Sequence, residues 1–395
     1  MIDFSQYLTE AEHHFPEMIQ IRRRLHQHPE LSYMEFETTR FLIDHLANLG
    51  YEVLKPLETG CVAVLKGKSP ESRIVALRAD IDALPIQEEG EHKKAFMSKI
   101  DGVAHCCGHD IHTANLLGAA RMIADKKVEL EGTVVLIFQP GEEKIPGGGK
   151  LLMDAGTLQE LGVQRIYGLH TFPYMKPGEI AVKSGPLMAS PDEFRLTIHG
   201  KGGHAAAPHI AVDPIVIAAQ VVTSLQSIVS RALDPTEPGV VTVGKISGGS
   251  AHNVIPERVE MLGTIRSFNE ETANLISSRI EQFAKGLAEA HGGSAEYYFD
   301  EGYPPVINDN EVTSKLLEIA ENVLGAEAIH MLEKPVMAGE DFAFYQKKFP
   351  GTFFFLGSGS EETGSVHSWH HPKYNADENC MKNGSALMTA LALKG

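Results

Sequence analysis

The sequence predicts an α/β protein whose mostly parallel mixed sheet is interrupted by a small inserted α+β domain. The chain has 395 residues, more than one hydrophobic core usually supports. Continuous apolar strands alternate with helices, as in sheets covered on both faces. We therefore expect a discontinuous domain made of residues 1–188 and 300–395, with a ferredoxin-like domain of residues 189–299 inserted into it.

In the first domain, apolar residues at helical spacing run from residue 15 to His28 and stop before Pro29, because the residue before a proline avoids the helical conformation. Four apolar strands follow, and each runs into acidic or histidine residues: "RIVALRADIDALP" (73–85), "TVVLIFQPGEE" (133–143), "RIYGLH" (165–170) and "GTFFFLG" (351–357). Ligands of such sheets gather beyond the carboxyl ends of the strands. We expect these polar clusters to meet at one edge.

In the inserted domain the pattern is strand, helix, strand, strand, helix, strand, which is the ferredoxin-like order. The expected strands span residues 193–200, 239–247, 258–268 and 294–299, and the expected helices span 212–231 and 270–290.

Composition narrows the class of partner. The chain carries 35 Lys and Arg against 52 Asp and Glu, a net charge of −17, which disfavours binding to nucleic acid and to anionic membranes. Residues 1–20 lack the features of a signal peptide, and no later stretch predicts a membrane span. With only four cysteines, a disulfide framework is not expected, and the sequence predicts a cytoplasmic location.

"HCCGHDIHTA" (105–114) places Cys107 and His109 on either side of one glycine at the start of a helix. A helix start favours thiolate character, and thiolate with imidazole suits a transition metal. Asp110 and His112 are candidates for orienting the ligands. A lone C-x-H pattern is equally compatible with a structural role.

Further candidate ligands follow other strands. Glu142 and Glu143 are adjacent, so one carboxylate can bind a metal while its neighbour faces metal-bound water. A solvated acidic loop is the alternative for this pair. His170 ends a strand, and His370 lies in "HSWHHP". Two metal ions sharing Cys107 would use this set.

The inserted domain adds three candidates: His204 as a catalytic residue, and Asn253 and Arg266 as substrate contacts. His204 and Asn253 lie on glycine-rich turns, and Arg266 follows in "GTIRS". The planar guanidinium of Arg266 suits a substrate carboxylate, whereas a surface ion pair is the alternative.

These motifs resemble those of one enzyme family over almost the whole chain. The matching stretches are "HQHPELSYMEFET", "LRADIDALPI", "HCCGHDIHTA", "FQPGEE", "GLH", "GKGGHAAAPH", "NVIPERVEMLGTIRSF", "MAGEDFAFY" and "HHPKYN". Together they resemble the amidohydrolase branch of the dinuclear aminoacylase/carboxypeptidase G-type metallopeptidases. The resemblance implies hydrolysis of N-acyl-L-amino acids with two divalent ions per subunit, drawn from Mn, Zn, Co and Ni.

The resemblance also implies a role for each candidate. Cys107 would bridge the ions, with Glu143 and His370 on one ion and His109 and His170 on the other. Glu142 would be the general base, and Asn253 and Arg266 would contact substrate. His204 would reach the site of a neighbouring subunit. The inserted domain would act as a lid and pair subunits in a homodimer, while a tetramer stays open.

Two positions depart from the family pattern. Cys106 stands where relatives often carry a small or apolar residue, and "HHP" offers His371 beside His370 as a last ligand. Three other functions stay open: a dinuclear dipeptidase or aminopeptidase, a thiol enzyme with Cys107 as nucleophile, and a non-catalytic scaffold with structural metals.

Overall fold

The computed structural model describes residues 4–395, which divide into two compact units. Unit 1 comprises the described residues up to Leu187 together with Ile307–Pro335 and Asp341–Gly395. Unit 2 comprises Met188–Val306 and the short return Val336–Glu340. The sequence pattern did not indicate that Val336–Glu340 belongs to unit 2.

Unit 1 is built on an eight-stranded mixed sheet with the order β1-β2-β4-β3-β5-β16-β6-β15. Its four central strands are parallel, and the pairs β1–β2, β2–β4 and β6–β16 are antiparallel. The predicted α/β class with a mixed sheet is confirmed. The strands are β1 Glu52–Leu54, β2 Cys61–Lys66, β3 Ile74–Asp80, β4 Thr133–Gln139, β5 Arg165–Phe172, β6 Ile180–Val182, β15 Ile329–Met331 and β16 Gly351–Gly357, and β7 Gly185–Met188 pairs separately with β14 Val306–Asn308.

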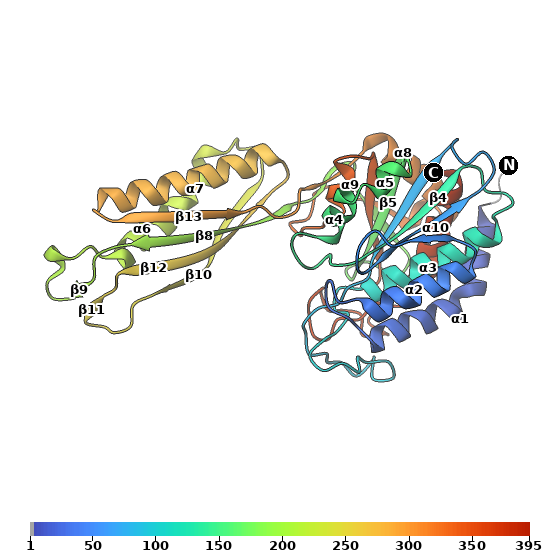
Figure 1. The fold of residues 1–395 in the computed structure, drawn as a ribbon, viewed down its shortest axis with the longest axis horizontal. Helices are drawn as coiled ribbons and strands as arrows, with labels where there is room; N and C mark the ends of the chain where they lie inside the picture. The colour runs from blue at the N-terminus through green and yellow to red at the C-terminus, as the bar shows by residue number, and fades with distance from the viewer. Residues whose placement is uncertain (1–3) are drawn as a thin grey trace. The chain divides into compact units, whose positions relative to one another are not determined.

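Helices cover the sheet of unit 1 (Figure 1). Helix α3 packs against α1 and α10. Helices α4 and α9 contact each other, and α4 also contacts β4 while α9 contacts β16. Strands β3, β4 and β16 are buried along their whole length, which explains their continuous apolar sequences. The helices are α1 Ser5–Gln27, α2 Phe36–Asn48, α3 His109–Asp125, α4 Gly148–Asp154, α5 Thr157–Glu160, α8 Asn310–Leu324, η3 Ala326–Ala328, α9 Ala343–Gln346 and α10 Cys380–Lys394.

Unit 2 has an antiparallel four-stranded sheet with the order β10-β12-β8-β13. Both α6 and α7 pack on this sheet, and the strand order is the ferredoxin-like one. Buried and more exposed residues alternate along β8, because only one face of the sheet meets the helices. The elements are β8 Ser190–His199, β9 Gly203–His204, η1 Pro208–Ile210, α6 Pro214–Ser227, η2 Ile228–Ala232, β10 Gly239–Gly248, β11 Val254–Ile255, β12 Arg258–Ser267, α7 Glu270–Ala290 and β13 Ser294–Asp300.

One helical stretch among the described residues, Pro214–Ala232, is long and apolar enough to cross a membrane by length and composition alone. Its side chains at Ile217, Val221 and Leu225 are buried in the core of unit 2. Core helices of soluble proteins meet the same criteria, so this helix is weak evidence for a membrane span.

Candidate metal centre

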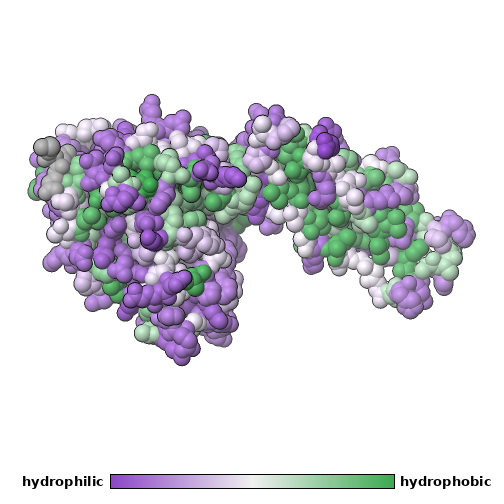
Figure 2. Space-filling model, turned by 180° about the vertical axis from the view of Figure 1, so that it is seen from behind, coloured by the Kyte–Doolittle hydropathy of each residue, from purple (hydrophilic) through white to green (hydrophobic). Residues whose placement is uncertain are grey.

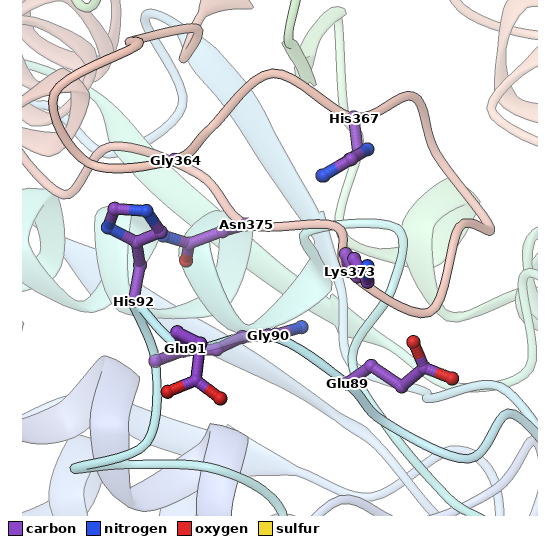
Figure 3. Close-up of a pocket in the computed structure, with 9 residues that line it drawn as sticks. Glu89, Gly90, Glu91, His92, Gly364, His367, Lys373 and Asn375 are labelled. Atoms are coloured by element: carbon purple, nitrogen blue, oxygen red, sulfur yellow. The ribbon is translucent and has the colours of Figure 1, made fainter.

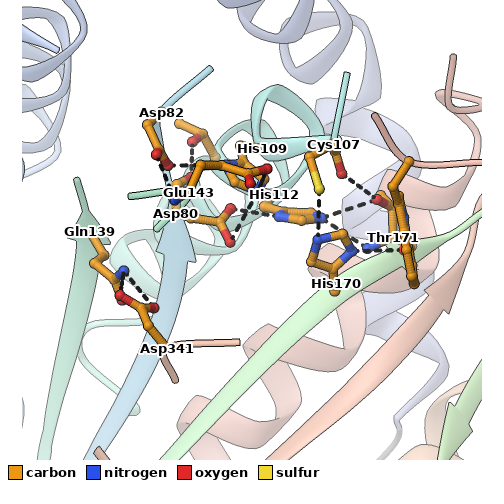
Figure 4. Close-up of polar contacts among 12 residues, drawn as sticks. Asp80, Asp82, Cys107, His109, His112, Gln139, Glu143, His170, Thr171 and Asp341 are labelled. Atoms are coloured by element: carbon orange, nitrogen blue, oxygen red, sulfur yellow. Dashed lines mark hydrogen bonds and ion pairs between the residues drawn. The ribbon is translucent and has the colours of Figure 1, made fainter. Parts of the chain in front are cut away.

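The candidate ligands of unit 1 lie where strands of the parallel sheet end. Strand β3 ends at Asp80, β4 is followed by the turn that carries Glu142 and Glu143, and His170 lies near the end of β5. Helix α3 begins at His109 in the same region (Figure 4). The sheet topology therefore brings together residues that are far apart in the sequence.

Gly108 sets the direction of Cys107 relative to α3. It adopts a φ of +95°, a left-handed conformation that favours glycine. A Cβ atom built at this position would lie 2.4 Å from Thr171 Oγ1 and 2.7 Å from the Tyr374 hydroxyl oxygen. Only glycine fits this turn.

Donor atoms of the candidate ligands form two groups that share Cys107. One group is Cys107, His109 and His170, and the other is Cys107, Glu143 and His370. Within each group the donor atoms lie within 4.8 Å of one another. A third group joins Glu142 and Glu143 with His109. Residues from four separate segments thus converge in one place, and Cys107 belongs to both groups.

Two buried atoms in these groups make no hydrogen bond. They are His109 Nε2 and Glu143 Oε1, which lie 3.9 Å apart. Buried polar atoms without a hydrogen bond are costly, and a metal ion would satisfy both. The close neighbour of Glu143 Oε1 is His370 Nε2, at 3.2 Å, which belongs to another candidate ligand. Since thiolate, imidazole and carboxylate all ligate transition metals, the residues fit a metal centre.

The histidines are held by further polar groups (Figure 4). His109 Nδ1 lies 3.1 Å from Asp82 Oδ1, and His170 Nδ1 lies 2.9 Å from the Thr171 carbonyl oxygen. Both contacts leave Nε2 for the site, and His170 Nε2 is 3.4 Å from Cys107 Sγ. Such partners fix the tautomer and the ring direction of a metal ligand.

His112 contacts Asp80 and the backbone next to His170. Its Nδ1 lies 2.6 Å from Asp80 Oδ1, and its Nε2 accepts a hydrogen bond from the Thr171 amide at 2.9 Å. His112 therefore ties α3 to the end of β5 beside His170. Asp110 binds Arg22 Nε at 2.8 Å and so joins α3 to α1.

Burial decides the protonation of Cys107 and His170. Burial, together with Glu143 and Glu142, raises the pKa of the Cys107 thiol well above its ordinary value. The expectation that the helix start favours thiolate is thus wrong for the metal-free protein, because burial and the acids outweigh the helix end. Burial, with His112 nearby, lowers the pKa of His170 well below its ordinary value, which keeps the imidazole neutral and able to bind a cation.

His109 has the opposite environment. Burial disfavours its charged form, but Asp80, Asp82 and Glu143 outweigh burial and raise its pKa to about 10. In the metal-free protein His109 therefore carries the positive charge that these carboxylates require. A metal ion would replace that proton.

A buried ion-pair network supports the site from the side of β3. Arg78 contacts Asp80 at 2.8 Å and Asp341 at 2.9 Å, and its Nε donates to Gln139 Oε1 at 2.9 Å. Asp341 was not among the predicted site residues, and Asp80 and Asp82 had no individual roles in the prediction. The available signal for Asp80 and Asp82 was the alternation of acids in "RADID" at the end of an apolar strand.

The loop after β16 brings His370 to the site and leaves His371 outside it. His370 Nε2 lies 3.2 Å from Glu143 Oε1, and its amide donates to the Cys106 carbonyl at 2.8 Å. His371 belongs to no candidate group among the described residues and stacks on His367 with the ring centres 4.4 Å apart. The Cys106 side chain is buried, and burial raises the pKa of its thiol to about 12.

The same loop lines a cavity of about 520 Å³ in unit 1 (Figure 3). The lining mixes acidic and basic side chains and contains none of the candidate ligands. Its residues are Glu89, Gly90, Glu91, His92, Lys93, Gly364, His367, Lys373 and Asn375.

The three remaining candidates lie in unit 2. His204 in β9 pairs with Val254 in β11, and the Ala205 amide donates to the Asn253 carbonyl at 3.1 Å, so His204 and Asn253 are neighbours. Arg266 lies in β12, where its guanidinium bonds Thr264 and the Ile265 carbonyl.

Comparison with known proteins agrees with this geometry. Residues 76–394 match the model of peptidase family M20/M25/M40. The chain is 41% identical to N-acetylcysteine deacetylase of Bacillus subtilis, over 95% of this chain and 96% of that protein. It is 46% identical to N-acyl-L-amino acid amidohydrolase of Geobacillus stearothermophilus, over 75% of this chain and 79% of that protein.

A solved structure extends the similarity to the fold. The Bacillus subtilis YXEP protein, described as a dinuclear metal-binding peptidase, superposes with a TM-score of 0.83 at 37% identity, over 97% of this chain and 98% of that one. The similarity spans nearly the whole chain, so this protein is an enzyme that hydrolyses amide bonds. The chain belongs to peptidase family M20/M25/M40 and, within that family, to the amidohydrolase branch.

Proposed function

We propose that the protein hydrolyses N-acyl-L-amino acids to a carboxylate and a free amino acid. The observation that carries this proposal is the pair of ligand groups sharing Cys107, with Glu142 beside Glu143 and His109. The names of the relatives at 41% and 46% identity support the N-acyl amino acid class of substrate.

The proposed centre would hold two divalent ions. Glu143 and His370 would bind one ion, His109 and His170 the other, and Cys107 both. Thiolate and imidazole suit Zn, Co and Ni, and the resemblance to the family adds Mn. When bound, divalent ions acidify water and polarise an amide carbonyl.

Glu142 is the proposed general base. Its carboxylate takes a proton from the attacking water and passes that proton to the leaving nitrogen. His204 would stabilise the oxyanion that develops on the substrate carbonyl, which is often the largest catalytic contribution. Asn253 and Arg266 would hold the substrate, with Arg266 facing its carboxylate.

The first experiment tests the requirement for metal. The protein is stripped with a chelator, restored with one metal at a time, and assayed with N-acetyl amino acids, N-benzoyl amino acids and dipeptides. Metal-restored hydrolysis of an N-acyl amino acid is the expected result. Preference for dipeptides would favour the dipeptidase alternative, and full activity without metal would favour Cys107 as a nucleophile.

Glu142→Gln tests the role of the general base. The variant keeps the size and hydrogen-bonding shape of the side chain but cannot accept the proton, so kcat should fall by a factor of about 10²–10⁴. Metal content and unfolding temperature should stay close to those of wild type. The exposed Glu131→Gln is the matched control, and wild-type kcat in Glu142→Gln would overturn the assignment.

We also propose that the protein is a homodimer whose subunits pair through unit 2. Unit 2 would also serve as a lid. Figure 2 shows apolar residues gathered on the visible face of this unit. Its exposed large apolar residues include Ile210, Ile215, Val216, Val229, Ile246 and Leu262. Strand β10 is an edge strand, whose free backbone groups can pair with another chain.

A cytoplasmic location is likewise a proposal. All four cysteines are buried and free, as is usual for proteins in a reducing compartment.

A further inference from the structure

We propose that Tyr33 is a positioning residue for the hydrolysis, because it holds the loop that carries Glu142 and Glu143 in place. This inference rests on the proposed function of that loop, residues 141–147. The positioning segment, residues 32–35, comes from the connection between α1 and α2 and contacts the loop at both ends.

The Tyr33 hydroxyl joins two points of the loop beyond Glu143. It donates to the Lys144 carbonyl oxygen at 2.6 Å and accepts a hydrogen bond from the Gly147 amide at 3.1 Å. Burial raises the pKa of Tyr33 to about 12, so the hydroxyl keeps its proton at neutral pH. The Gly147 amide also donates to the Lys144 carbonyl oxygen at 3.0 Å, so the Tyr33 hydroxyl reinforces a backbone turn at the far end of the loop.

The near end of the loop is held by the Tyr33 ring and by Glu35. A Cβ atom at Gly141 would lie 2.2 Å from Cε1 of Tyr33, so the ring lies directly against the backbone before Glu142. The Gly141 amide donates to Glu35 Oε1 at 2.8 Å. Gly141, the residue before the proposed base Glu142, is thus held by both the Tyr33 ring and the Glu35 carboxylate.

Ser32 extends the same support to the ligand shell. Its hydroxyl donates to Asp82 Oδ2 at 2.7 Å, and that oxygen also accepts from the Glu143 amide at 3.0 Å. The other oxygen of Asp82 faces His109, as described above. The segment, the loop and the histidine ligand therefore form one connected set of contacts.

The backbone of Tyr33 is held in an unusual conformation. Its φ is +66°, which is rare for a bulky residue and persists only where the surroundings enforce it. Glu35 Oε1 accepts from the Tyr33 amide at 2.9 Å and helps to enforce it. This conformation places the ring against Gly141 and the hydroxyl between Lys144 and Gly147.

Tyr33→Phe tests the proposal because it keeps the ring and removes only the hydroxyl. We expect kcat to fall about 10- to 100-fold, since small displacements of catalytic groups are costly, while KM changes little. Metal content should match that of wild type. Tyr51→Phe is the matched control, because the buried Tyr51 hydroxyl also donates to a carbonyl, that of Ala120 at 2.9 Å, away from the loop.

Amide hydrogen exchange supplies a readout that needs neither activity nor metal. In the metal-free protein the Gly147 amide should exchange about two- to fivefold faster in Tyr33→Phe than in wild type. The amide loses the Tyr33 hydroxyl as an acceptor but keeps the Lys144 carbonyl oxygen, which lies at 3.0 Å. Tyr51→Phe should leave this amide unchanged. Unchanged exchange, unchanged kcat, or an equal kcat loss in Tyr51→Phe would each overturn the proposal.

The two proposals fail in different ways. If the wild-type protein hydrolyses no N-acyl amino acid, the proposed function fails and the role of Tyr33 in that reaction fails with it. If the wild type is active and Tyr33→Phe is equally active, only the positioning role fails.

Discussion

Cys107 and His170 differ in chemistry although the same buried site surrounds them. Burial favours the uncharged form of both residues, so the pKa of the thiol is raised and it keeps its proton, while the pKa of the imidazole is lowered and it loses its own. His170 is therefore ready to bind a cation, whereas Cys107 must first release a proton. Metal affinity should accordingly rise with pH.

Glu88 illustrates how a buried acid links stability to pH. Its Oε1 atom lies 2.6 Å from His26 Nε2 and 2.7 Å from Lys93 Nζ. Burial opposes ionisation, but these two partners outweigh it and lower the pKa of Glu88 from 4.5 to about 2. Because the folded pKa is the lower one, this stabilisation is complete above pH 4.5 and is lost as the pH falls toward 2.

Glu88→Gln should therefore reduce the free energy of unfolding by about 3 kcal/mol at pH 7, the equivalent of the pKa shift. The gap between wild type and variant should shrink as the pH falls below 4.5. Urea unfolding between pH 3 and 7 measures both values. The exposed neighbour Glu89→Gln should change stability by less than about 0.5 kcal/mol, and a gap independent of pH would contradict the assignment.

At the scale of elements, the start of α3 is the point where local backbone and metal binding meet. Gly108 separates two candidate ligands and leaves no room for a side chain. Its φ is positive, and Thr171 and Tyr374 lie close to the point where a Cβ atom would stand. A change at this position should therefore disturb the site as well as the fold.

Gly108→Ala should lower the free energy of unfolding by about 3 kcal/mol, because it adds both backbone strain and a steric clash. Metal binding should weaken as Cys107 and His109 are displaced. Gly102→Ala is the matched control: Gly102 has a φ of +72°, no neighbouring atom lies within 4 Å of the point where its Cβ would stand, and the change should cost about 1 kcal/mol. Thermal unfolding and metal titration of both variants measure the difference, and equal losses would show that the clash is unimportant.

Elements were predictable from sequence where the signal is local. The apolar run before Pro29 indicated the end of α1, which lies at Gln27, and local patterns indicated the order of strands and helices along unit 2. The contacts of Asp80 with His112 and of Arg78 with Asp341 were not predictable in this way. They join separate segments, and their geometry depends on the sheet order that one sequence pattern does not reveal.

The candidate ligands could be named from the sequence, but their protonation states could be predicted only in part. The residues that the motifs indicated as ligands do converge in unit 1. The thiol of Cys107 was expected to ionise readily, but its pKa is raised, because that expectation considered only the helix end and not the depth of burial or the nearby carboxylates. Local sequence identifies donors, whereas protonation depends on everything packed around them.

At the scale of the whole molecule, the proposed roles are divided between the two units. The candidate ligands belong to unit 1, whereas His204, Asn253 and Arg266 belong to unit 2. If subunits pair through unit 2, a residue of one subunit can complete the site of the other. A two-fold pair would then contain two equivalent composite sites.

Mixing two inactive variants tests whether His204 acts across the dimer. His204→Ala keeps Glu142, and Glu142→Gln keeps His204, so a mixed dimer would contain one site with both residues intact. The two proteins are co-expressed with different tags, and purification through both tags in turn retains only mixed dimers. Because one of the two sites in each mixed dimer is complete, about half of the wild-type rate of N-acyl amino acid hydrolysis should return.

The control pairs Glu142→Gln with a protein that carries both substitutions. Every site then lacks Glu142, and no activity should return. If the first mixture also stays inactive although mixed dimers form, His204 does not act across the dimer. Because the two substitutions lie in different units, recovery can arise only where unit 1 of one chain and unit 2 of the other build the same site.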